Sequence, residues 1–282
     1  MIIDFHTHTF PDKIADAALA KLREASGTVS FTKGTNAALR GSMEKAGVDL
    51  SVVLPVATNP AKVYHINEIS SSLDGKENLC HFGCIHPECE DIEKEVEHIA
   101  SLGLRGVKIH PVYQGVDIDD DRFVKILTEC GKAGLIVVTH AGLDIGFPGV
   151  VRCSPKMIRR AIEKAGDVIL VLAHMGGWRN WDEVEETLSD TGAYIDTSFS
   201  LGKLTPLSDG RYSERDLQML NGEKFVSIVR AFGADHVLFG TDSPWSDQKK
   251  SISAIEALPL TKEEIKQIFG DNAKKLLKIS AY

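Results

Sequence analysis

Apolar and polar positions along the chain follow two different spacings. Short apolar runs rich in branched residues recur eight times, and most are separated by longer stretches in which apolar residues return every three or four positions. Uninterrupted runs are typical of strands buried on both faces, whereas the longer spacing is typical of amphipathic helices. We therefore predict strands at residues 2–7, 50–56, 80–86, 105–110, 135–140, 168–174, 193–197 and 236–242.

The helical spacing is clearest at residues 91–102, where Ile92, Val96, Ile99 and Leu102 fall on one face, opposite charged residues. Such a helix should pack on the outside of a sheet. Glycine follows several of these stretches, where a helix C-cap favours it. Similar patterns predict helices over residues 12–25, 119–133, 155–165, 181–190, 222–232 and 261–278.

Alternating strands and helices predict parallel strands joined by right-handed crossovers, and eight repeats close into an α/β (β/α)8 barrel, the TIM barrel. An open, doubly wound sheet is the alternative. The 282 residues, 43% of them hydrophobic, suit a single barrel domain over residues 1–282. Two connections, residues 9–47 and 198–222, are long and irregular, so we expect substrate selection there.

Composition narrows the class of partner. The net charge of −8 and the lack of a basic cluster argue against nucleic acid. No apolar stretch approaches the length of a membrane span and no leader pattern opens the chain, so we expect a cytoplasmic protein that acts on a small molecule. Five cysteines, an odd number, favour reduced thiols over a disulfide framework. Assembly into a homo-oligomer stays open.

The polar residues that end the predicted strands are types that bind metal ions. His6 and His8 stand at the end of the first apolar run, and side chains two positions apart in a strand point the same way. His140, His174 and Asp242 end later strands. In a parallel barrel the carboxyl ends of all strands open on one face, where the active sites of this architecture lie. We therefore expect a metal centre on that face.

His6, His8, His140 and Asp242 together offer three nitrogen ligands and one oxygen ligand. This set suits a single Zn²⁺, and also Mn²⁺, Fe²⁺ or Co²⁺. A divalent ion lowers the pKa of its bound water, which makes hydroxide available near neutral pH. We predict that Asp242 both binds the ion and accepts a proton, and that His174 is the second proton carrier. A lone histidine at a strand end is more often structural, so this prediction rests on the joint occurrence.

Five motifs follow one another along the chain: IDFHTH at residues 3–8, GVKIHP at 106–111, THAG at 139–142, LAHMGG at 172–177 and FGTDSPW at 239–245. In this order they resemble the amidohydrolase superfamily, in particular its amidohydrolase-related branch of TIM-barrel metal-dependent hydrolases and decarboxylases. The resemblance covers residues 2–277. It implies a single metal ion at His6, His8, His140 and Asp242 and an acid–base role for His174, and it leaves the substrate open.

Lys108 and His110 suggest a second interpretation, a site for a second metal ion or for substrate. In binuclear members of the superfamily, a lysine near the end of the fourth strand is carbamylated and bridges two ions, and residues like His140 and His174 hold the second ion. A bare ammonium beside a cation is repelled, so an inward Lys108 needs a carbamate, a carboxylate partner such as Asp4, or a role in the metal-free protein. The alternative is a structural or substrate-contacting lysine.

The motifs serve more than one activity. Our first expectation is a hydrolase that attacks an amide, ester or lactone carbonyl with a metal-activated water. The alternative is a lyase, a non-oxidative decarboxylase or hydratase of a small carboxylic acid, and a third reading is an inactive barrel used for binding. An arginine at the barrel mouth would favour the lyase because it holds a carboxylate. The candidates are Arg40, Arg152, Arg179 and Arg211.

Residues just beyond the strand ends are candidates for the pocket wall. We expect Tyr113, Phe147, Trp178 and Trp245 there, with ordinary packing at the rim as the alternative reading. His86 ends the third predicted strand and is a further candidate. Cysteines and histidines cluster around it, but their spacing is not that of a paired zinc motif, so we interpret the segment as a buried strand. The cluster consists of Cys80, His81, Cys84, His86 and Cys89.

Overall fold

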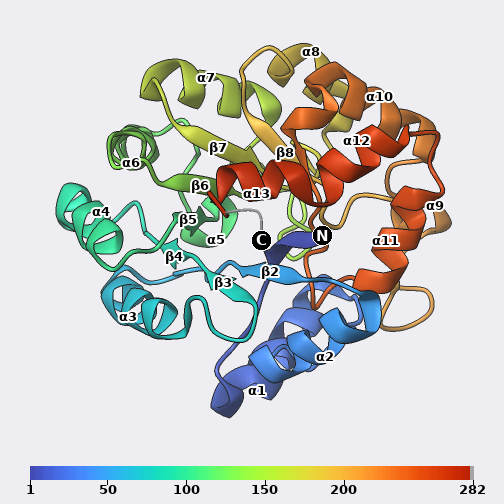
Figure 1. Cartoon of the computed structure of the whole chain (residues 1–282), viewed down its shortest axis with the longest axis horizontal. Helices are drawn as coiled ribbons and strands as arrows, with labels where there is room; N and C mark the ends of the chain where they lie inside the picture. The colour runs from blue at the N-terminus through green and yellow to red at the C-terminus, as the bar shows by residue number, and fades with distance from the viewer. Residues whose placement is uncertain (280–282) are drawn as a thin grey trace.

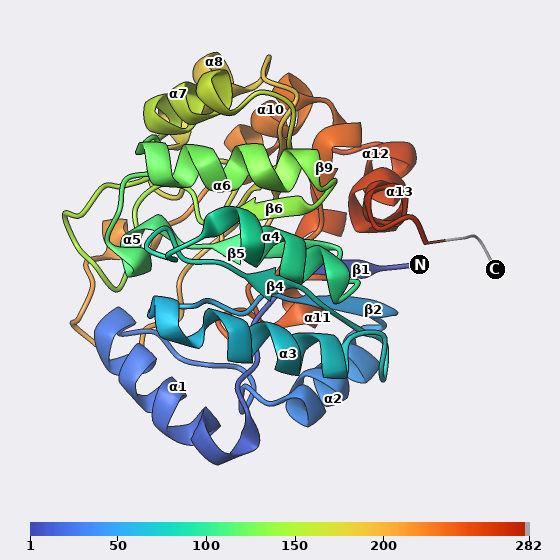
Figure 2. The same cartoon turned by 90° about the vertical axis from the view of Figure 1, so that its left-hand side faces the viewer.

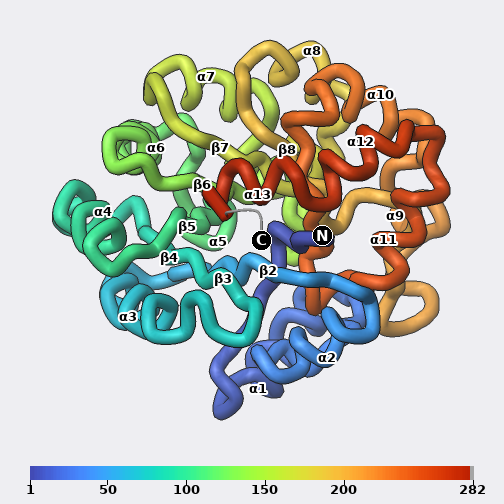
Figure 3. The backbone as a smooth tube through the Cα atoms, in the orientation of Figure 1, coloured from blue at the N-terminus to red at the C-terminus, as the bar shows by residue number. Residues whose placement is uncertain are grey.

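The computed structural model describes residues 1–279. Its strands form a ring of parallel neighbours enclosed by helices (Figure 1). The colour runs around this ring in sequence order (Figure 3), as expected when each crossover leads to the adjacent strand. The strands are β1 (Ile3–Thr7), β2 (Leu50–Val53), β3 (Leu79–His81), β4 (Gly83–Cys84), β5 (Gly106–Ile109), β6 (Ile136–Thr139), β7 (Ile169–Leu172), β8 (Tyr194–Asp196) and β9 (Val237–Leu238).

Each of these strands lies inside a predicted one except β3, which begins one residue earlier, and β3 and β4 together correspond to the strand predicted at residues 80–86. The single residue between them, Phe82, donates its N–H to the carbonyl of Val53 over 3.0 Å. The last strand joins the first, because the N–H of Phe5 donates to the carbonyl of Phe239 over 2.7 Å. The predicted eight-stranded parallel barrel is confirmed.

The barrel interior is filled by fully buried apolar side chains. Phe5, Val138, Val171 and Leu238 converge there from four strands, each with no solvent exposure. A larger apolar layer lies between the strands and the surrounding helices. At the carboxyl ends of the strands the interior residues become polar, beginning with Lys108, which is 1% exposed. Burial of apolar side chains thus stabilises the strands, and the polar side chains suited to catalysis lie at one end of the barrel.

Amphipathic helices cover the outside. The predicted helices at 155–165 and 222–232 have the observed bounds, and the one predicted at 261–278 is interrupted by a π-helical turn over Gln267–Asp271. The α-helices are α1 (Asp12–Ser26), α2 (Asn36–Ala46), α3 (Val63–Leu73), α4 (Ile92–Ser101), α5 (Pro111–Gln114), α6 (Asp121–Lys132), α7 (Pro155–Ala165), α8 (Trp181–Leu188), α9 (Glu214–Leu217), α10 (Gly222–Phe232), α11 (Gln248–Glu256), α12 (Lys262–Lys266) and α13 (Asn272–Leu276).

Helix α3 had no clear amphipathic signal because its inner face is partly polar. Its buried residues are Val63, Asn67 and Ser70. The side-chain amide of Asn67 accepts from the N–H of Cys84 over 2.8 Å and donates to the carbonyl of the same residue over 3.0 Å. A polar residue therefore docks this helix onto β4, so the face of the helix that contacts the barrel has no regular apolar spacing.

The two long connections meet above the barrel mouth. Helix α1 lies apart from the strands at the lower left of Figure 2. The second connection reaches the carboxyl end of this helix, where the N–H of Leu207 donates to the carbonyl of Gly27 over 2.7 Å. Arg211 Nη2 donates to the carbonyl of Glu24 over 2.6 Å. Within residues 1–279, no helix is long and apolar enough to cross a membrane.

Candidate metal centre

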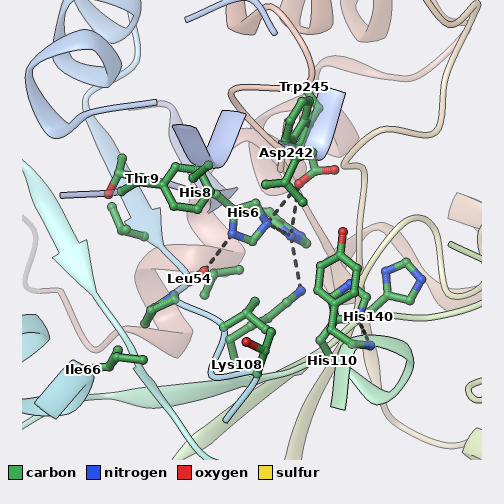
Figure 4. A pocket seen from close by; sticks show the side chains of 18 of the residues that line it. His6, His8, Thr9, Leu54, Ile66, Lys108, His110, His140, Asp242 and Trp245 are labelled. Atoms are coloured by element: carbon green, nitrogen blue, oxygen red, sulfur yellow. Dashed lines mark hydrogen bonds and ion pairs between the residues drawn. The ribbon is translucent and has the colours of Figure 1, made fainter. Parts of the chain in front are cut away.

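Three of the predicted ligands come together at the carboxyl end of the barrel. The Nε2 atoms of His6 and His8 are 3.2 Å apart, and Asp242 Oδ1 lies 3.1 Å from His8 Nε2 and 3.6 Å from His6 Nε2. Figure 4 shows these side chains facing one another. Two imidazole nitrogens and one carboxylate oxygen thus converge on one point, which is a donor set suited to a divalent transition metal ion.

The outer nitrogens of both histidines are already occupied. His6 Nδ1 is 2.7 Å from Asp196 Oδ2, and His8 Nδ1 is 2.7 Å from the carbonyl oxygen of Leu54. An acceptor at Nδ1 places the ring proton there, which leaves the lone pair of Nε2 free and directed toward Asp242. This arrangement is typical of metal-binding histidines and supports the fit of an ion to this group.

Backbone geometry at the first and last strands positions these ligands. The register of β1 shifts between Asp4 and Thr7, and the N–H of Asp242 donates to the carbonyl of His6 over 2.7 Å. A Cβ added at Gly240 would lie 2.9 Å from the Cβ of His6. Glycine in the last motif therefore permits the close approach that places Asp242 beside the histidines.

The contacts of Asp4 correct the suggested partnership between Asp4 and Lys108. Asp4 accepts hydrogen bonds from Thr241 Oγ1 over 2.6 Å and from Gln248 Nε2 over 2.8 Å, on the side of helix α11. Lys108 instead places its Nζ 3.3 Å from His6 Nε2. The register of β1 is irregular between Asp4 and Thr7, so the simple alternation of a regular strand does not hold over this segment.

Lys108 is buried in this group, with 1% of its surface exposed. Burial lowers its pKa to about 8, although the nearby carboxylates of Asp196 and Asp242 act in the opposite direction. Burial, together with the charge on Lys108, also holds the pKa of His6 well below its usual value. His6 is therefore neutral at physiological pH, which is the protonation state that a metal ligand requires.

His140 lies in a neighbouring group, with His110 and Asp144. Its ring stacks on that of His110, with ring centroids 4.3 Å apart, and Asp144 Oδ2 is 3.4 Å from His110 Nε2. Burial lowers the pKa of His140 to about 3. The structure thus brings together three of the four predicted ligands, and places the fourth beside His110, the predicted second-metal or substrate-contacting residue.

His174 bridges the two groups. Its Nε2 is 3.1 Å from His140 Nδ1, and its Nδ1 is 3.0 Å from Ser198 Oγ. Its ring centroid lies 5.3 Å from that of His6. Burial, followed by the neighbouring histidines, holds the pKa of His174 well below its usual value, so the ring is neutral at physiological pH.

A cavity of about 1010 Å³ opens over these groups. Of the predicted wall residues, Tyr113, Trp178 and Trp245 line it. Phe147 packs behind Tyr113, with the ring centroids 5.2 Å apart. Among the described residues that line the cavity, His86 is absent; its Nδ1 instead accepts from the N–H of Glu88 over 3.1 Å. The carbonyl of His86 also accepts from the N–H of Cys89 over 3.0 Å, so His86 stabilises the turn that follows β4.

Only one of the four candidate arginines lines this cavity in the described part of the chain, and it is Arg40 of helix α2. The guanidinium of Arg152 pairs with Asp117 over 2.8 Å. Arg179 donates to backbone carbonyls of residues 216 and 218, and Arg211 is bound to helix α1. The last three arginines therefore hold loops in place.

Two carboxylates of the site escaped the sequence analysis. Asp196 ends β8 and is fully buried, so the same strand-end signal that identified Asp242 could have found it. Asp144 lies in the loop after β6, where no periodicity marks it. The cysteine–histidine cluster around His86 contributes to neither of the two candidate metal groups among residues 1–279.

Comparison with known proteins identifies the family and supports the fold. The sequence profile of the amidohydrolase family matches residues 79–279. Among curated proteins, no sequence matches the chain. The solved structures that share the fold over nearly the whole chain include the following three, whose sequence identities are too low to indicate more than fold.

The chain is 16% identical to a 5-carboxyvanillate decarboxylase of Sphingomonas paucimobilis, with 99% of each chain covered and a TM-score of 0.70. It is 13% identical to the 5-carboxyvanillate decarboxylase of Novosphingobium aromaticivorans with bound manganese, covering 99% of this chain and 97% of that one, with a TM-score of 0.69. A putative 2-pyrone-4,6-dicarboxylic acid hydrolase of Pseudomonas putida is 16% identical, covering 100% and 98%, with a TM-score of 0.64. The profile match, the five motifs and the barrel together show that the chain belongs to the amidohydrolase family, as its sequence suggested.

Proposed function

We propose that this protein is a metal-dependent, non-oxidative decarboxylase of a small carboxylic acid. The observation that carries the proposal is the position of His6, His8 and Asp242 in a cavity walled by aromatic side chains. Tyr113, Trp178, Phe199 and Trp245 all line it. Flat apolar walls suit an unsaturated or aromatic acid, and both decarboxylases described above are named for such a substrate.

An apolar pocket favours loss of carbon dioxide for a simple electrostatic reason. A carboxylate loses hydration when it enters surroundings of low polarity, and its charge leaves the carboxyl group as the bond to carbon breaks. A divalent ion held by His6, His8 and Asp242 would supply positive charge that binds and orients the substrate's oxygen atoms. Zinc is our first choice, and manganese, present in one of the relatives, is equally compatible with these donors.

Side chains of the protein would bind the charged carboxylate of the substrate and transfer the proton. Lys108, buried beside His6, offers an ammonium that attracts a carboxylate into the pocket. His174 is held by Ser198 and His140, and is our candidate for the group that moves a proton to or from substrate carbon. His110 and Asp144 lie next to His140 and are placed to contact the substrate on its other side.

Hydrolysis of an amide, ester or lactone is the second candidate. Asp242 favours it, because its carboxylate lies 3.1 Å from His8 Nε2, where it could take a proton from an attacking water. Burial raises the pKa of Asp242, which makes this carboxylate a better base. The putative dicarboxylic acid hydrolase that shares the fold supports the same reading.

A substrate screen in isotopically labelled water separates the two candidates. Unsaturated carboxylic acids, esters and lactones are incubated with metal-loaded protein in H₂¹⁸O, and both gas and product are analysed by mass spectrometry. Decarboxylation releases carbon dioxide and leaves no ¹⁸O in a new carboxyl group, whereas hydrolysis incorporates one ¹⁸O. Asp242→Asn should abolish either reaction, and Asp235→Asn, at an exposed carboxylate away from the site, is the matched control. If only ¹⁸O incorporation is found, the decarboxylase proposal is wrong.

A further inference from the structure

We propose that the substrate carries an apolar chain that lies in a channel between helices α1, α2 and α3, and that the far end of this chain bears a hydrogen-bond acceptor. The inference rests on the proposed metal centre, but not on which of the two reactions occurs. It deepens the proposed function because it names a substrate class: an elongated acid or acyl compound with polar groups at both ends.

The channel is a continuation of the cavity over the metal centre. The same hollow that is lined by His6 and Asp242 is also lined by residues of all three helices. On α1 these are Ile14, Ala18 and Leu22, which are spaced by four positions and so form one stripe along the helix. The hollow therefore extends well beyond the space that a small head group needs.

Helix α3 supplies the opposite wall. Its lining residues Ile66, Ile69 and Leu73 follow one another at spacings of three and four, again on one face. Side chains from both walls keep contact with solvent: Ile14 is 52% exposed, and Ile69 and Leu73 are partly exposed. Two facing apolar stripes that do not bury each other leave room for an apolar ligand between them.

The far end of the channel is polar. Arg40 of α2 and Glu77 form an ion pair with 2.8 Å between Nη1 and Oε1, and both line the cavity together with His81. His81 is 4% exposed, yet its Nε2 has no hydrogen-bond partner among the described residues, and the same holds for Nε of Arg40. A buried polar atom without a partner is costly, so an acceptor on the ligand would satisfy a need that the protein leaves open.

These features together describe a ligand of defined chemistry. One end reaches the metal centre, a middle section contacts the two apolar stripes, and the distal acceptor meets Arg40 and His81. A medium-length chain with a terminal carboxylate or carbonyl has this pattern. Glu77, paired with Arg40, keeps the far end from binding a bare inorganic anion tightly, so the apolar section must contribute to affinity.

The experiment measures binding of two homologous series by calorimetry to metal-loaded protein. One series runs from acetohydroxamate to dodecanohydroxamate and ends in a methyl group. The other consists of monohydroxamates of linear dicarboxylic acids and ends in a carboxylate. Each added methylene of the first series should tighten Kd by about fourfold until the channel is filled. The second series should show one optimal chain length, at which the carboxylate reaches Arg40 and His81.

Variants of the channel residues test where the apolar chain of the ligand binds. Leu22→Asp should remove the dependence on chain length and leave acetohydroxamate binding unchanged, whereas Ala20→Asp, on the exposed face of the same helix, should behave as wild type. If Leu22→Asp fails to fold, Ala18→Trp provides the same test of the channel, because it fills the channel without introducing a buried charge. His81→Phe should abolish the optimum of the carboxylate series while the methyl series keeps its slope.

A metal-free arm keeps this test separate from the proposed function. Binding of n-alkanols to metal-free protein should show the same chain-length dependence, and the same loss in Leu22→Asp. If acetohydroxamate does not bind to metal-loaded protein, the proposed metal centre fails while the alkanols still report on the channel. Affinities that do not change with chain length in either arm, or equal behaviour of Leu22→Asp and Ala20→Asp, overturn the channel. A carboxylate series without an optimum overturns the polar end.

Discussion

Asp196 Oδ2 lies 2.7 Å from His6 Nδ1, and both residues are buried almost completely. The other oxygen of the same carboxylate accepts from the backbone N–H of His174 and of Ser198, each over 3.0 Å. One carboxylate therefore orients a candidate metal ligand and, at the same time, the backbone of the candidate proton carrier. We consider Asp196 the residue that links the two functions of the site.

Asp196→Asn should weaken metal binding by about 10–100-fold, because an amide no longer fixes the ring proton of His6 on Nδ1. Competition with a chromophoric chelator measures the affinity. Asp182→Asn, at an exposed carboxylate of α8, is the control and should bind metal as wild type does. Unchanged affinity in a folded Asp196→Asn protein would show that His6 does not depend on this partner.

His174→Asn should keep its metal and lose turnover. The side chain of His174 contacts Ser198 and His140 but is not part of the His6–His8–Asp242 group, so its removal should spare the ion. A general acid–base group contributes about 10²–10⁴ in rate, and a fall in kcat within this range is expected with KM little changed. Loss of metal together with activity would place His174 among the ligands instead.

Lys108→Met should bind the metal ion more tightly than wild type, by roughly tenfold, because a buried ammonium next to His6 repels a cation. A carbamylated Lys108 predicts the reverse, since its removal would delete a ligand and the second metal equivalent. Metal affinity and stoichiometry, measured side by side for both proteins, decide between a bare and a modified lysine.

Much of the fold was predictable because the barrel strands are continuous apolar runs, such as residues 135–140 around β6. Helices α2 and α3 were not predicted, for different physical reasons. Only Leu39 and Met43 of α2 are buried, and α3 buries Asn67 and Ser70, so neither shows a regular apolar stripe toward the barrel. A helix that docks through polar or sparse contacts leaves little trace in the sequence.

The residues at the strand ends could be predicted as members of the site, but which of them lie close together could not. The positions of His6, His8 and Asp242 followed from the barrel alone. The association of His140 with His110 and Asp144 depends on side-chain directions and on a loop, which strand periodicity does not encode. The hydrogen bonds from Thr241 and Gln248 to Asp4 likewise cannot be recognised from an apolar run.

Cysteine reactivity should be confined to one position in the native protein. All five cysteines are free, and burial raises the pKa of Cys80, Cys130 and Cys153 to about 12 and that of Cys84 as well. Only Cys89 is partly exposed. At pH 8 a thiol reagent should label a single cysteine, and Cys89→Ser should remove that reaction.

The same shifts set a direction for stability at high pH. Between pH 9 and about 12 the unfolded chain loses thiol protons that the folded protein keeps at Cys130, so the free energy of unfolding falls as pH rises through this window. Cys130→Ala should make this fall less steep in urea titrations. An equally steep fall in the variant would assign it to other groups.

The central claim is that His6, His8 and Asp242 hold a divalent metal ion at the barrel mouth. Elemental analysis of the purified protein, together with that of His6→Ala/His8→Ala and of His140→Ala, tests it most directly. We predict about one equivalent of a divalent transition metal in wild type, with the double variant losing it. The metal content of the His140→Ala variant shows whether His140, the fourth predicted ligand, joins His6, His8 and Asp242 when metal binds. A folded double variant that keeps the wild-type metal content would contradict the account.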